Sequence, residues 1–278
     1  MHDHKTTFSA GCDGTVRMWD VTQGPNAVQQ IGKHDQPVRC MKWMPELNLL
    51  ATGSWDKSIR FWDCRQPTPA QTFQLSERVY AMDTRGKILV CGTADKQLSV
   101  WPDVTLGANQ KIEYKTPLND FQTRCISIFH DHSGFAVGSI EGRVGIEYFD
   151  EVEQKSKKGG VKLPNAKSFV FKCHRDKQDI FGVNCLDFYS KHNDKFLTGG
   201  GDGSLYWWDK KARNRLAIKD KFKTNATIVD AKFSPNGSSM FYVCSYDWSK
   251  GAEHKNKYPL NQIYHHAVLE KDMTSKKK

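Results

Sequence analysis

The stretch GSWDKSIRFWD, residues 53–63, decides the fold of this 278-residue chain. Residues 58–62 predict a short strand, because side chains two positions apart lie on one face of a strand. Asp56 precedes this strand and belongs to a tight turn, where polar residues are favoured. Four further segments align with residues 55–63 without gaps: CDGTVRMWD ending at Asp20, ADKQLSVWP at Pro102, IEGRVGIEY at Tyr148 and GDGSLYWWD at Asp209.

Each of these segments carries an acid six residues before its tryptophan position, which recurs at residues 19, 62, 101, 147 and 208. Residue 147 is Glu rather than Trp, and the longest interval indicates an insertion before Trp208. Further apolar strands precede the segments, for example at residues 49–54 and 38–43. Three or four strands per repeat are typical of one blade of a β-propeller, and such blades bury their faces only against one another. The sequence therefore predicts an all-β propeller.

Composition excludes several other classes of protein. The chain is 38% hydrophobic and 26% charged, contains no run of about 18 apolar residues, and has no apolar leader. Its eight cysteines form no C-x-x-C pair, so we expect reduced thiols in the core. A net charge of +10 favours acidic partners, although solubilising lysines, such as those at 276–278, account for part of it.

Motifs for catalysis are missing from the sequence. It has no G-x-S-x-G elbow, no H-E-x-x-H pair and no glycine-rich phosphate loop with Lys. Three pairs of histidines have no third or fourth metal ligand nearby in the sequence. They are His2 and His4, His130 and His132, and His265 and His266. We therefore expect no catalytic, cofactor or metal site and no enzyme activity; a propeller enzyme is the less favoured alternative.

The repeat resembles the WD40 family. This resemblance implies a buried hydrogen-bond network that joins a loop His, a turn Asp, a strand Ser or Thr and the strand Trp. His34, Asp56, Trp62 and either Ser54 or Thr52 match this pattern best. The corresponding scaffold positions in the other repeats are Asp13, Trp19, Asp95, Trp101, Asp202 and Trp208.

The family propeller has seven blades, whereas this chain begins only a few residues before its first repeat segment. We expect it to lack the first blade and part of the second. Either the sequence is a shortened form of a longer protein, which we favour, or six copies close by another pairing. We predict one propeller domain over residues 1–269, with a flexible inter-blade insertion at 150–166 and a basic, disordered tail at 270–278.

A narrower resemblance rests on five strings in order: GSWDKSIRFWD, GSIEGRVGIEY, FKCHR, GDGSLYWWDKKAR and SYDWSKG. Together they are similar to the WD40 mRNA export factors of the nuclear pore. The related WD40 spindle-checkpoint proteins share GSIEGRV and FKCHR, and SYDWSKG favours the export factors. The alternative is a mitotic checkpoint scaffold that binds a related peptide in kinetochore kinases.

The resemblance to the export factors implies a non-catalytic scaffold that binds a phenylalanine–glycine nucleoporin segment and RNA or ribonucleoprotein. Proteins of the mitotic spindle or checkpoint are further candidate partners. We expect no binding to a membrane. The expected location is the nucleus and the pore complex of the nuclear envelope, with shuttling to the cytoplasm. The expected form is a monomer within a heteromeric complex.

Arg143, Lys172 and Arg175 are the candidate contacts to the nucleoporin peptide, because Arg captures carboxylates through paired hydrogen bonds. The alternative is that these cations only end a strand, with their charges in solvent.

The RNA candidates form a basic run beside Trp207, which strand alternation places opposite a buried Trp208. The alternative is a lysine-rich turn, with Trp207 packed on the adjoining blade. The basic run contains Lys210, Lys211, Arg213 and Arg215 and is followed by Lys219, Lys221 and Lys223.

Overall fold

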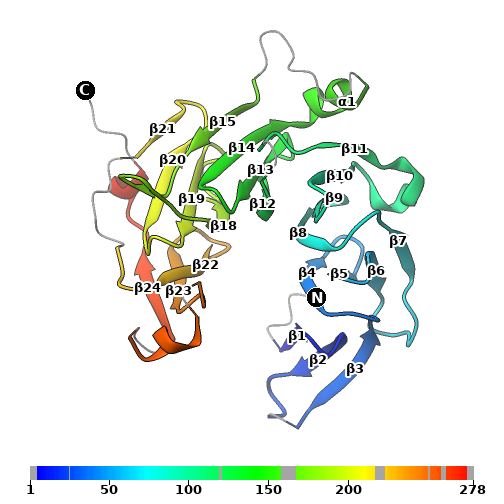
Figure 1. Cartoon of the computed structure of the whole chain (residues 1–278). Coiled ribbons are helices and arrows are strands. Elements are labelled where there is room, and N and C mark those ends of the chain that lie inside the picture. The colour runs from blue at the N-terminus through cyan, green and yellow to red at the C-terminus, as the bar shows by residue number, and fades with distance from the viewer. Residues whose placement is uncertain are drawn as a thin grey trace. The chain divides into compact units, whose positions relative to one another are not determined.

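The structure, a computed structural model, describes residues 5–24, 26–118, 121–157, 167–216, 223–249, 251–257 and 261–273 (Figure 1). These residues form six antiparallel sheets of three or four strands each, which is the strand content of propeller blades. The chain divides into two compact units, Met1–Thr116 and Pro117–Lys278, each with three of the sheets. The expectation of one domain over residues 1–269 stays a prediction. None of the described helices has the length and apolar character to cross a membrane.

In the first unit the strands of each sheet are paired in chain order. The three sheets consist of β1 (Thr6–Ala10), β2 (Thr15–Asp20) and β3 (Val28–Lys33); β4 (Val38–Met44), β5 (Leu49–Ser54), β6 (Ser58–Trp62) and β7 (Gln71–Gln74); and β8 (Val79–Arg85), β9 (Ile88–Thr93), β10 (Gln97–Trp101) and β11 (Ile112–Lys115). The short 3-10 helices η1 (Val104–Leu106) and η2 (Ala108–Gln110) connect β10 to β11.

Apolar side chains of neighbouring sheets fill the core of this unit. Val16 and Ile31 of the first sheet pack with Leu50 and Trp62 of the second. Gly32 permits this contact, because a Cβ atom at this position would lie 2.2 Å from the Trp62 ring. The sheets therefore bury their faces against one another, as blades do.

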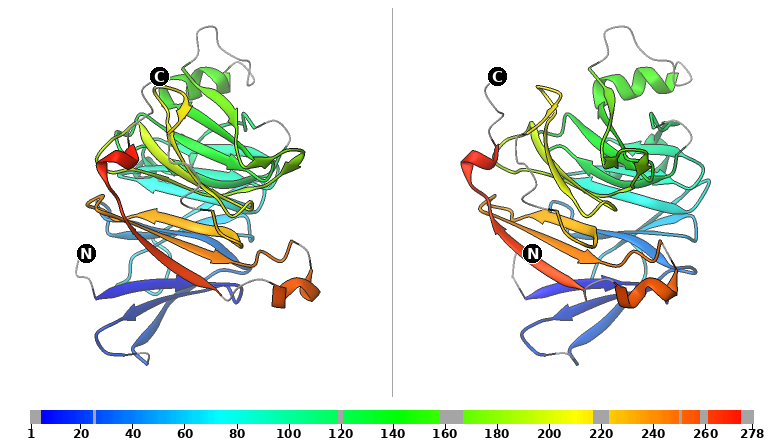
Figure 2. Two further views of the ribbon diagram at one scale, coloured as in Figure 1. Left: turned by 90° about the vertical axis from the view of Figure 1, so that its left-hand side faces the viewer. Right: turned by 60° about the vertical axis from the view of Figure 1, so that its left-hand side comes forward.

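The second unit repeats this arrangement. Its sheets consist of β12 (Thr123–Ile128), β13 (Gly134–Ser139), β14 (Arg143–Tyr148) and β15 (Phe169–Lys172); β18 (Val183–Phe188), β19 (Lys195–Gly200), β20 (Leu205–Asp209) and β21 (Asn214–Arg215); and β22 (Thr227–Phe233), β23 (Ser239–Ser245) and β24 (Gln262–Ala267). A two-stranded ribbon, β16 (Arg175–Asp176) and β17 (Asp179–Ile180), lies in the connection between the first two sheets. Two 3-10 helices, η3 (Ala252–Lys257) and η4 (Glu270–Met273), lie at opposite ends of the third sheet (Figure 2).

The first strand of five sheets has a register shift near its start. In β12, for example, Thr123 faces Ser139 and Cys125 faces Gly138, so Arg124 between them is left out of the pairing. A bulge of this kind redirects the side chain of the extra residue and is common beside binding sites. The bulged positions are Arg39, Tyr80, Arg124, Asn184 and Val229.

A chain of buried hydrogen bonds joins two strands, a loop and a turn in the first unit. The Trp62 indole donates to Thr52 Oγ1 (2.7 Å), Thr52 Oγ1 lies 2.7 Å from His34 Nε2, and His34 Nδ1 lies 2.8 Å from Asp56 Oδ2. Thr52 therefore occupies the middle place, whereas Ser54 donates to backbone carbonyl groups. A neutral imidazole with its proton on Nδ1 satisfies every member of this chain, as buried polar groups require.

The second unit contains an equivalent chain built around His174. Its Nδ1 lies 2.8 Å from Asp202 Oδ1 and its Nε2 lies 2.9 Å from Thr198 Oγ1, which accepts from the Trp208 indole. The sequence reasoning missed His174, which precedes Asp202 by 28 residues, whereas His34 precedes Asp56 by 22. The two histidines share a place in the connection before the first strand of a sheet, and not a fixed spacing from the turn acid.

The other scaffold candidates have simpler partners. Trp19 donates to Ser9 Oγ, and Asp13 accepts from the backbone N–H of Thr15. Trp101 donates to the Ala108 carbonyl, while Asp95 accepts from Thr93 and Ser76. In these two repeats no histidine contacts the turn acid among the described residues.

Two expectations about irregular segments were wrong in part. The insertion expected at 150–166 begins as a helix, α1 (Phe149–Lys157), because Val152 is buried and the Glu151 carboxylate accepts from the backbone N–H groups of Lys167 and Ser168. Residues 158–166 lie outside the described part. The tail expected to be disordered from residue 270 begins with η4, in which Met273 is buried and Asp272 contacts His266. Residues 274–278 also lie outside the described part.

We expect Thr52→Val to lower the free energy of unfolding by about 1–3 kcal/mol, because it leaves His34 Nε2 and the Trp62 indole without a partner in the interior. Thr72→Val makes the same chemical change at an exposed position of β7 and should cost almost nothing. Denaturant unfolding of the three proteins measures the difference. Equal stability of the two variants would contradict the structural role of Thr52.

Stability should also depend on the protonation of His34. Burial lowers the pKa of His34 below 6.5, although the Asp56 carboxylate partly offsets the effect. The unfolded chain therefore binds this proton at a higher pH than the folded chain does. The contribution of His34 is complete above the unfolded pKa and is lost as the pH falls toward the lower folded pKa.

The stability gap between wild type and His34→Gln should consequently shrink from about pH 7.5 to about pH 5. His192→Gln, which removes an exposed histidine, serves as the control. Denaturant unfolding at several pH values measures both gaps. A gap for His34→Gln that stays constant or widens on acidification would disprove this assignment.

Candidate functional site

Strand pairing brings the three peptide-contact candidates to one end of a sheet. Arg143 of β14 lies directly opposite Lys172 of β15. Three residues after Lys172, and directly after His174 in a left-handed conformation (φ 48°), Arg175 begins β16. Arg175 Nη2 donates to the carbonyl oxygen of Glu141 (3.1 Å), and the Glu141 carboxylate lies 3.9 Å from Arg143 Nε.

This cluster has an excess of positive charge. Arg143 and Arg175 are half-buried, and their Nε atoms have no hydrogen-bond partner among the described residues. Lys172 is exposed and has no ion-pair partner in the same part of the chain. Glu141 is therefore outnumbered, and an added carboxylate would be stabilised here.

A pocket of about 250 Å³ opens beside these cations, and we call it the cationic pocket. Aromatic rings form part of its wall: the Arg215 guanidinium lies 4.9 Å from the centre of the Tyr206 ring, and Trp208 lies next to Tyr206. Such a combination of cations and rings suits an anionic group attached to a flat or apolar one. The pocket is lined by Lys172, Cys173, His174, Arg175, Tyr206, Trp208 and Arg215.

The expectation that Trp207 offers an aromatic edge to RNA was wrong. Its side chain is 1% exposed and packs edge-on against Phe233, with ring centres 5.3 Å apart. Trp208, expected to be the buried residue, is partly exposed in the cationic pocket. The sheet that contains β22 covers the face of β20 to which Trp207 belongs.

Lys210 is also unsuited to RNA contact. Its side chain is 4% exposed, its ammonium group lies 3.1 Å from Asp194 Oδ1, and it sits 4.6 Å from the centre of the Phe129 ring. These contacts fix Lys210 inside the protein. It therefore stabilises the packing of two neighbouring sheets.

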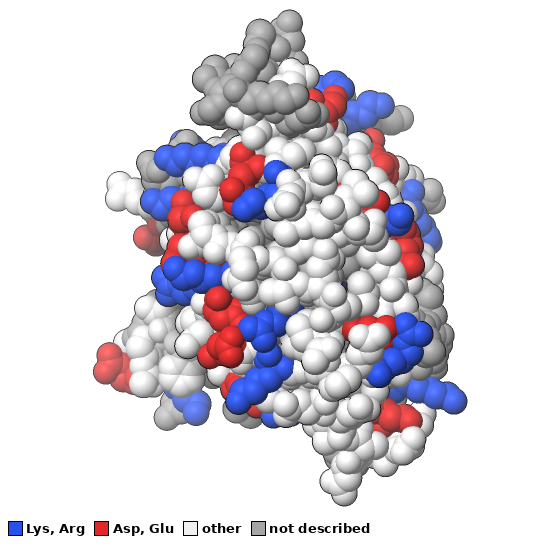
Figure 3. Space-filling view, turned by 90° about the vertical axis from the view of Figure 1, so that its right-hand side faces the viewer, with Lys and Arg blue, Asp and Glu red and all other residues white. Residues whose placement is uncertain are grey.

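The remaining basic candidates lie on the surface. Lys211, Arg213 and Arg215 are exposed, and Arg213 stacks on the Phe169 ring at 4.5 Å. Lys223 is exposed as well, whereas Lys219 and Lys221 lie outside the described residues. On the face of the molecule in Figure 3, by contrast, Lys and Arg lie beside Asp and Glu, so both signs of charge are mixed there.

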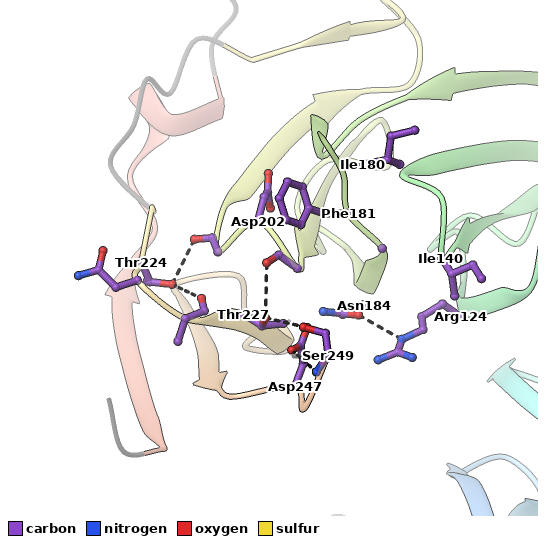
Figure 4. Close-up of a pocket in the computed structure, with 15 residues that line it drawn as sticks. Arg124, Ile140, Ile180, Phe181, Asn184, Asp202, Thr224, Thr227, Asp247 and Ser249 are labelled. Atoms are coloured by element: carbon purple, nitrogen blue, oxygen red, sulfur yellow. Dashed lines mark hydrogen bonds between the residues drawn. The ribbon is translucent and has the colours of Figure 1, made fainter. Parts of the chain in front are cut away.

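A second pocket, of about 460 Å³, was not predicted from the sequence (Figure 4). We call it the Arg124 pocket. Arg124 and Ile140 lie on its β12–β13 side, and Asp247 and Ser249 lie on the side of the loop after β23 (Figure 4). Sequence reasoning began this strand at Cys125, and the bulge that redirects Arg124 had no recognisable signal.

The two carboxylates that line the Arg124 pocket accept hydrogen bonds from other groups of the protein. Burial is the largest single influence on Asp202 and raises its pKa, but the interactions with His174 and the hydrogen bonds from Ser204 and Tyr206 together outweigh it and lower the pKa below 3.8. Asp247 accepts from Thr227 Oγ1 (3.0 Å) and from the backbone N–H of Ser249 (3.1 Å), and its pKa is lowered in the same way despite burial. Both groups are therefore ionised and internally bonded at neutral pH.

The described residues contain no group of three or more His, Cys, Asp or Glu side chains placed to hold a metal ion. All eight cysteines are free thiols. Burial raises the pKa of Cys40 to about 11 and of Cys125 to about 12, so these thiols are poor nucleophiles at neutral pH. His130 contacts the carbonyl oxygen of Phe188 (2.9 Å), which is a structural role.

Comparison with known proteins agrees with this geometry. Residues 1–20, 26–63 and 166–209 match the family described as WD domain, G-beta repeat. One chain of a structure titled "Crystal Structure of Mitotic Checkpoint Complex" superposes with a TM-score of 0.69, covering 87% of this chain and 70% of that one. At 16% sequence identity this likeness shows the shared fold.

Two curated relatives are more similar in sequence. The mRNA export factor GLE2 of Chaetomium thermophilum is 39% identical over 274 residues, which are 95% of this chain and 71% of that protein. The Poly(A)+ RNA export protein of Schizosaccharomyces pombe is 34% identical over 285 residues, which are 99% of this chain and 75% of that protein. This chain therefore belongs to the family of WD40-repeat mRNA export factors that includes GLE2.

Proposed function

We propose that this protein is a non-catalytic scaffold in mRNA export, which holds an acidic segment of a phenylalanine–glycine nucleoporin at the nuclear pore and also contacts RNA. Membership of the export-factor family supports the export role and a location in the nucleus and at its envelope. The cationic pocket supports the binding mode, because it places Lys172, Arg175 and Arg215 around two aromatic rings.

The nucleoporin segment would contribute carboxylates to these cations. Arg175 is anchored by the Glu141 carbonyl, so its guanidinium is held in place before the peptide arrives. An anchored arginine loses little side-chain freedom on binding, which favours affinity. Lys172 adds an exposed charge to the lining of the cationic pocket.

RNA would contact the neighbouring exposed cations, Lys211, Arg213 and Arg215. Phosphate groups bind such cations with little dependence on base sequence. Arg215 lines the cationic pocket and also belongs to this basic run. The peptide and RNA surfaces therefore adjoin at Arg215, and the two ligands should compete in part.

We expect Lys172→Glu and Arg175→Glu each to weaken binding of the nucleoporin segment at least about tenfold, because each replaces attraction by repulsion. Lys191→Glu changes the charge equally at an exposed site outside both pockets and should have little effect. Fluorescence anisotropy with a labelled segment measures the affinities. Absence of binding to wild type, or equal affinity of all the variants, would refute the proposed peptide site.

For RNA, we expect the double variant Lys211→Glu/Arg215→Glu to weaken binding of a single-stranded oligonucleotide and to reduce its salt dependence. Each lost phosphate contact should reduce the slope of log K against log salt by about 0.7. Trp207→Phe should leave RNA affinity unchanged, since this side chain is buried. Filter binding at several salt concentrations tests both statements. A large RNA defect in folded Trp207→Phe, with none in the double variant, would reverse the assignment.

A further inference from the structure

An exposed tryptophan lies in the loop that follows β23. The chain has eight tryptophans, and Trp248 is the most exposed of them, at 55%. Its neighbours Asp247 and Ser249 line the Arg124 pocket (Figure 4), whereas Trp248 lines neither that pocket nor the cationic pocket. The indole ring is therefore an open aromatic surface, and not part of a pocket wall.

The backbone of Trp248 is strained. Its φ angle is 60°, in the left-handed region, which is unfavourable for a bulky side chain and favours Gly. Burial of the ring does not offset this cost, because more than half of the residue is exposed to solvent. A backbone outlier that packing does not explain is typical of a residue that contacts a ligand.

Hydrogen bonds on both sides of Trp248 hold the loop in one conformation. Asp247 accepts from the backbone N–H of Ser249 (3.1 Å), and the Trp248 carbonyl oxygen accepts from the backbone N–H of Gly251 (3.1 Å). The Tyr246 hydroxyl donates to the Gly251 carbonyl oxygen (2.8 Å), and the Tyr246 ring lies 5.5 Å from the Trp248 ring. The indole is thus positioned before a ligand arrives, which lowers the entropic cost of binding.

A cation lies beside this ring. The Lys255 ammonium group of η3 lies 5.8 Å from the centre of the Trp248 ring, and Lys255 is exposed. It has no ion-pair partner in the described part of the chain. Since Glu253 of the same helix is acidic, we expect one phosphate contact here and not a broad basic surface.

This combination favours a nucleotide over a peptide side chain. A nucleotide presents a flat base and a phosphate group together, and a base stacks on any open aromatic face. An apolar peptide side chain gains more from an enclosed pocket, and Trp248 lines none of the pockets described above.

We propose that Trp248 and Lys255 form a second RNA contact: an unpaired base stacks on the indole ring, and a phosphate group of the same strand contacts Lys255. This inference rests on the RNA binding in the proposed function and adds a site outside the basic run at residues 211–215. It gives the RNA the aromatic contact that the sequence analysis assigned to Trp207, which is buried. Stacking tolerates every base, so we expect little dependence on base sequence.

RNA binding to variants of Trp248 tests the stacked base. The probe is a fluorescein-labelled single-stranded RNA of about 12 nucleotides. Trp248→Ala should weaken its binding about tenfold, and Trp248→Phe should weaken it less, because Phe keeps an aromatic face. Trp55→Ala removes another exposed tryptophan and should have little effect. No loss for Trp248→Ala, or an equal loss for Trp55→Ala, would overturn the proposal.

Salt dependence separates the base contact from the phosphate contact. Trp248→Ala removes no charge and should leave the slope of log K against log salt unchanged, whereas Lys255→Gln should reduce it by about 0.7. Inorganic polyphosphate has charge but no bases, so it should bind Trp248→Ala as tightly as wild type. A polyphosphate defect of Trp248→Ala as large as its RNA defect would rule out stacking on the indole.

Stability measurements test the strained backbone. Trp248→Gly should have a higher midpoint of denaturant unfolding than Trp248→Ala, because Gly adopts this φ angle without a steric penalty. Both variants should bind RNA equally weakly. A lower midpoint for Trp248→Gly would contradict the strain assigned to this position.

The outcomes separate this inference from the proposed function. If RNA binds and responds to Lys211→Glu/Arg215→Glu but not to Trp248→Ala, the second contact is refuted and the proposed function stands. If RNA does not bind wild type, this inference fails together with the RNA part of the proposed function. A defect of Trp248→Ala in binding the nucleoporin segment, with none in binding RNA, would assign the loop to the peptide and overturn the proposal.

Discussion

A buried histidine in each unit connects a loop to the turn that follows it, and in the second unit the proposed peptide site depends on this contact. In the second unit the hydrogen bonds run from Trp208 through Thr198 and His174 to Asp202. Every group in this chain is satisfied inside the protein, so displacement of any one leaves another without a partner. The loop residues on both sides of His174 are held in place as a result.

The same contact organises the two pockets. His174 has a left-handed backbone, which turns the chain so that Lys172 and Arg175 lie at one pocket, and Asp202 forms part of the other. Stability and the proposed recognition therefore depend on neighbouring residues of one segment. The buried side chain of His174 stabilises the fold, and Lys172 and Arg175 beside it reach solvent. This division is expected for a scaffold whose repeats supply rigidity and whose loops supply specificity.

Much of the fold was predictable from sequence because its signals are local. Alternation and turn residues located the strands, and those expected at residues 49–54 and 58–62 are β5 and β6. The burial of Trp207 was not predictable. Alternation shows that Trp207 and Trp208 lie on opposite faces of the strand, but it does not show which of the two faces a distant sheet covers. Helix α1 was missed because its polar composition resembles a loop, and the burial of Val152 and the hydrogen bonds of Glu151 depend on distant residues. The role of Arg124 depends on a bulge, which arises from pairing between strands and has no marker in one strand alone.

The central claim is the proposal that this export-factor relative holds an acidic peptide at the cationic pocket, beside the bond between His174 and Asp202. A crystal structure of the full chain with the nucleoporin segment tests it most directly. The account predicts peptide carboxylates within hydrogen-bond distance of Lys172 and Arg175 in the cationic pocket. A peptide bound elsewhere, with the cationic pocket empty, would contradict the account.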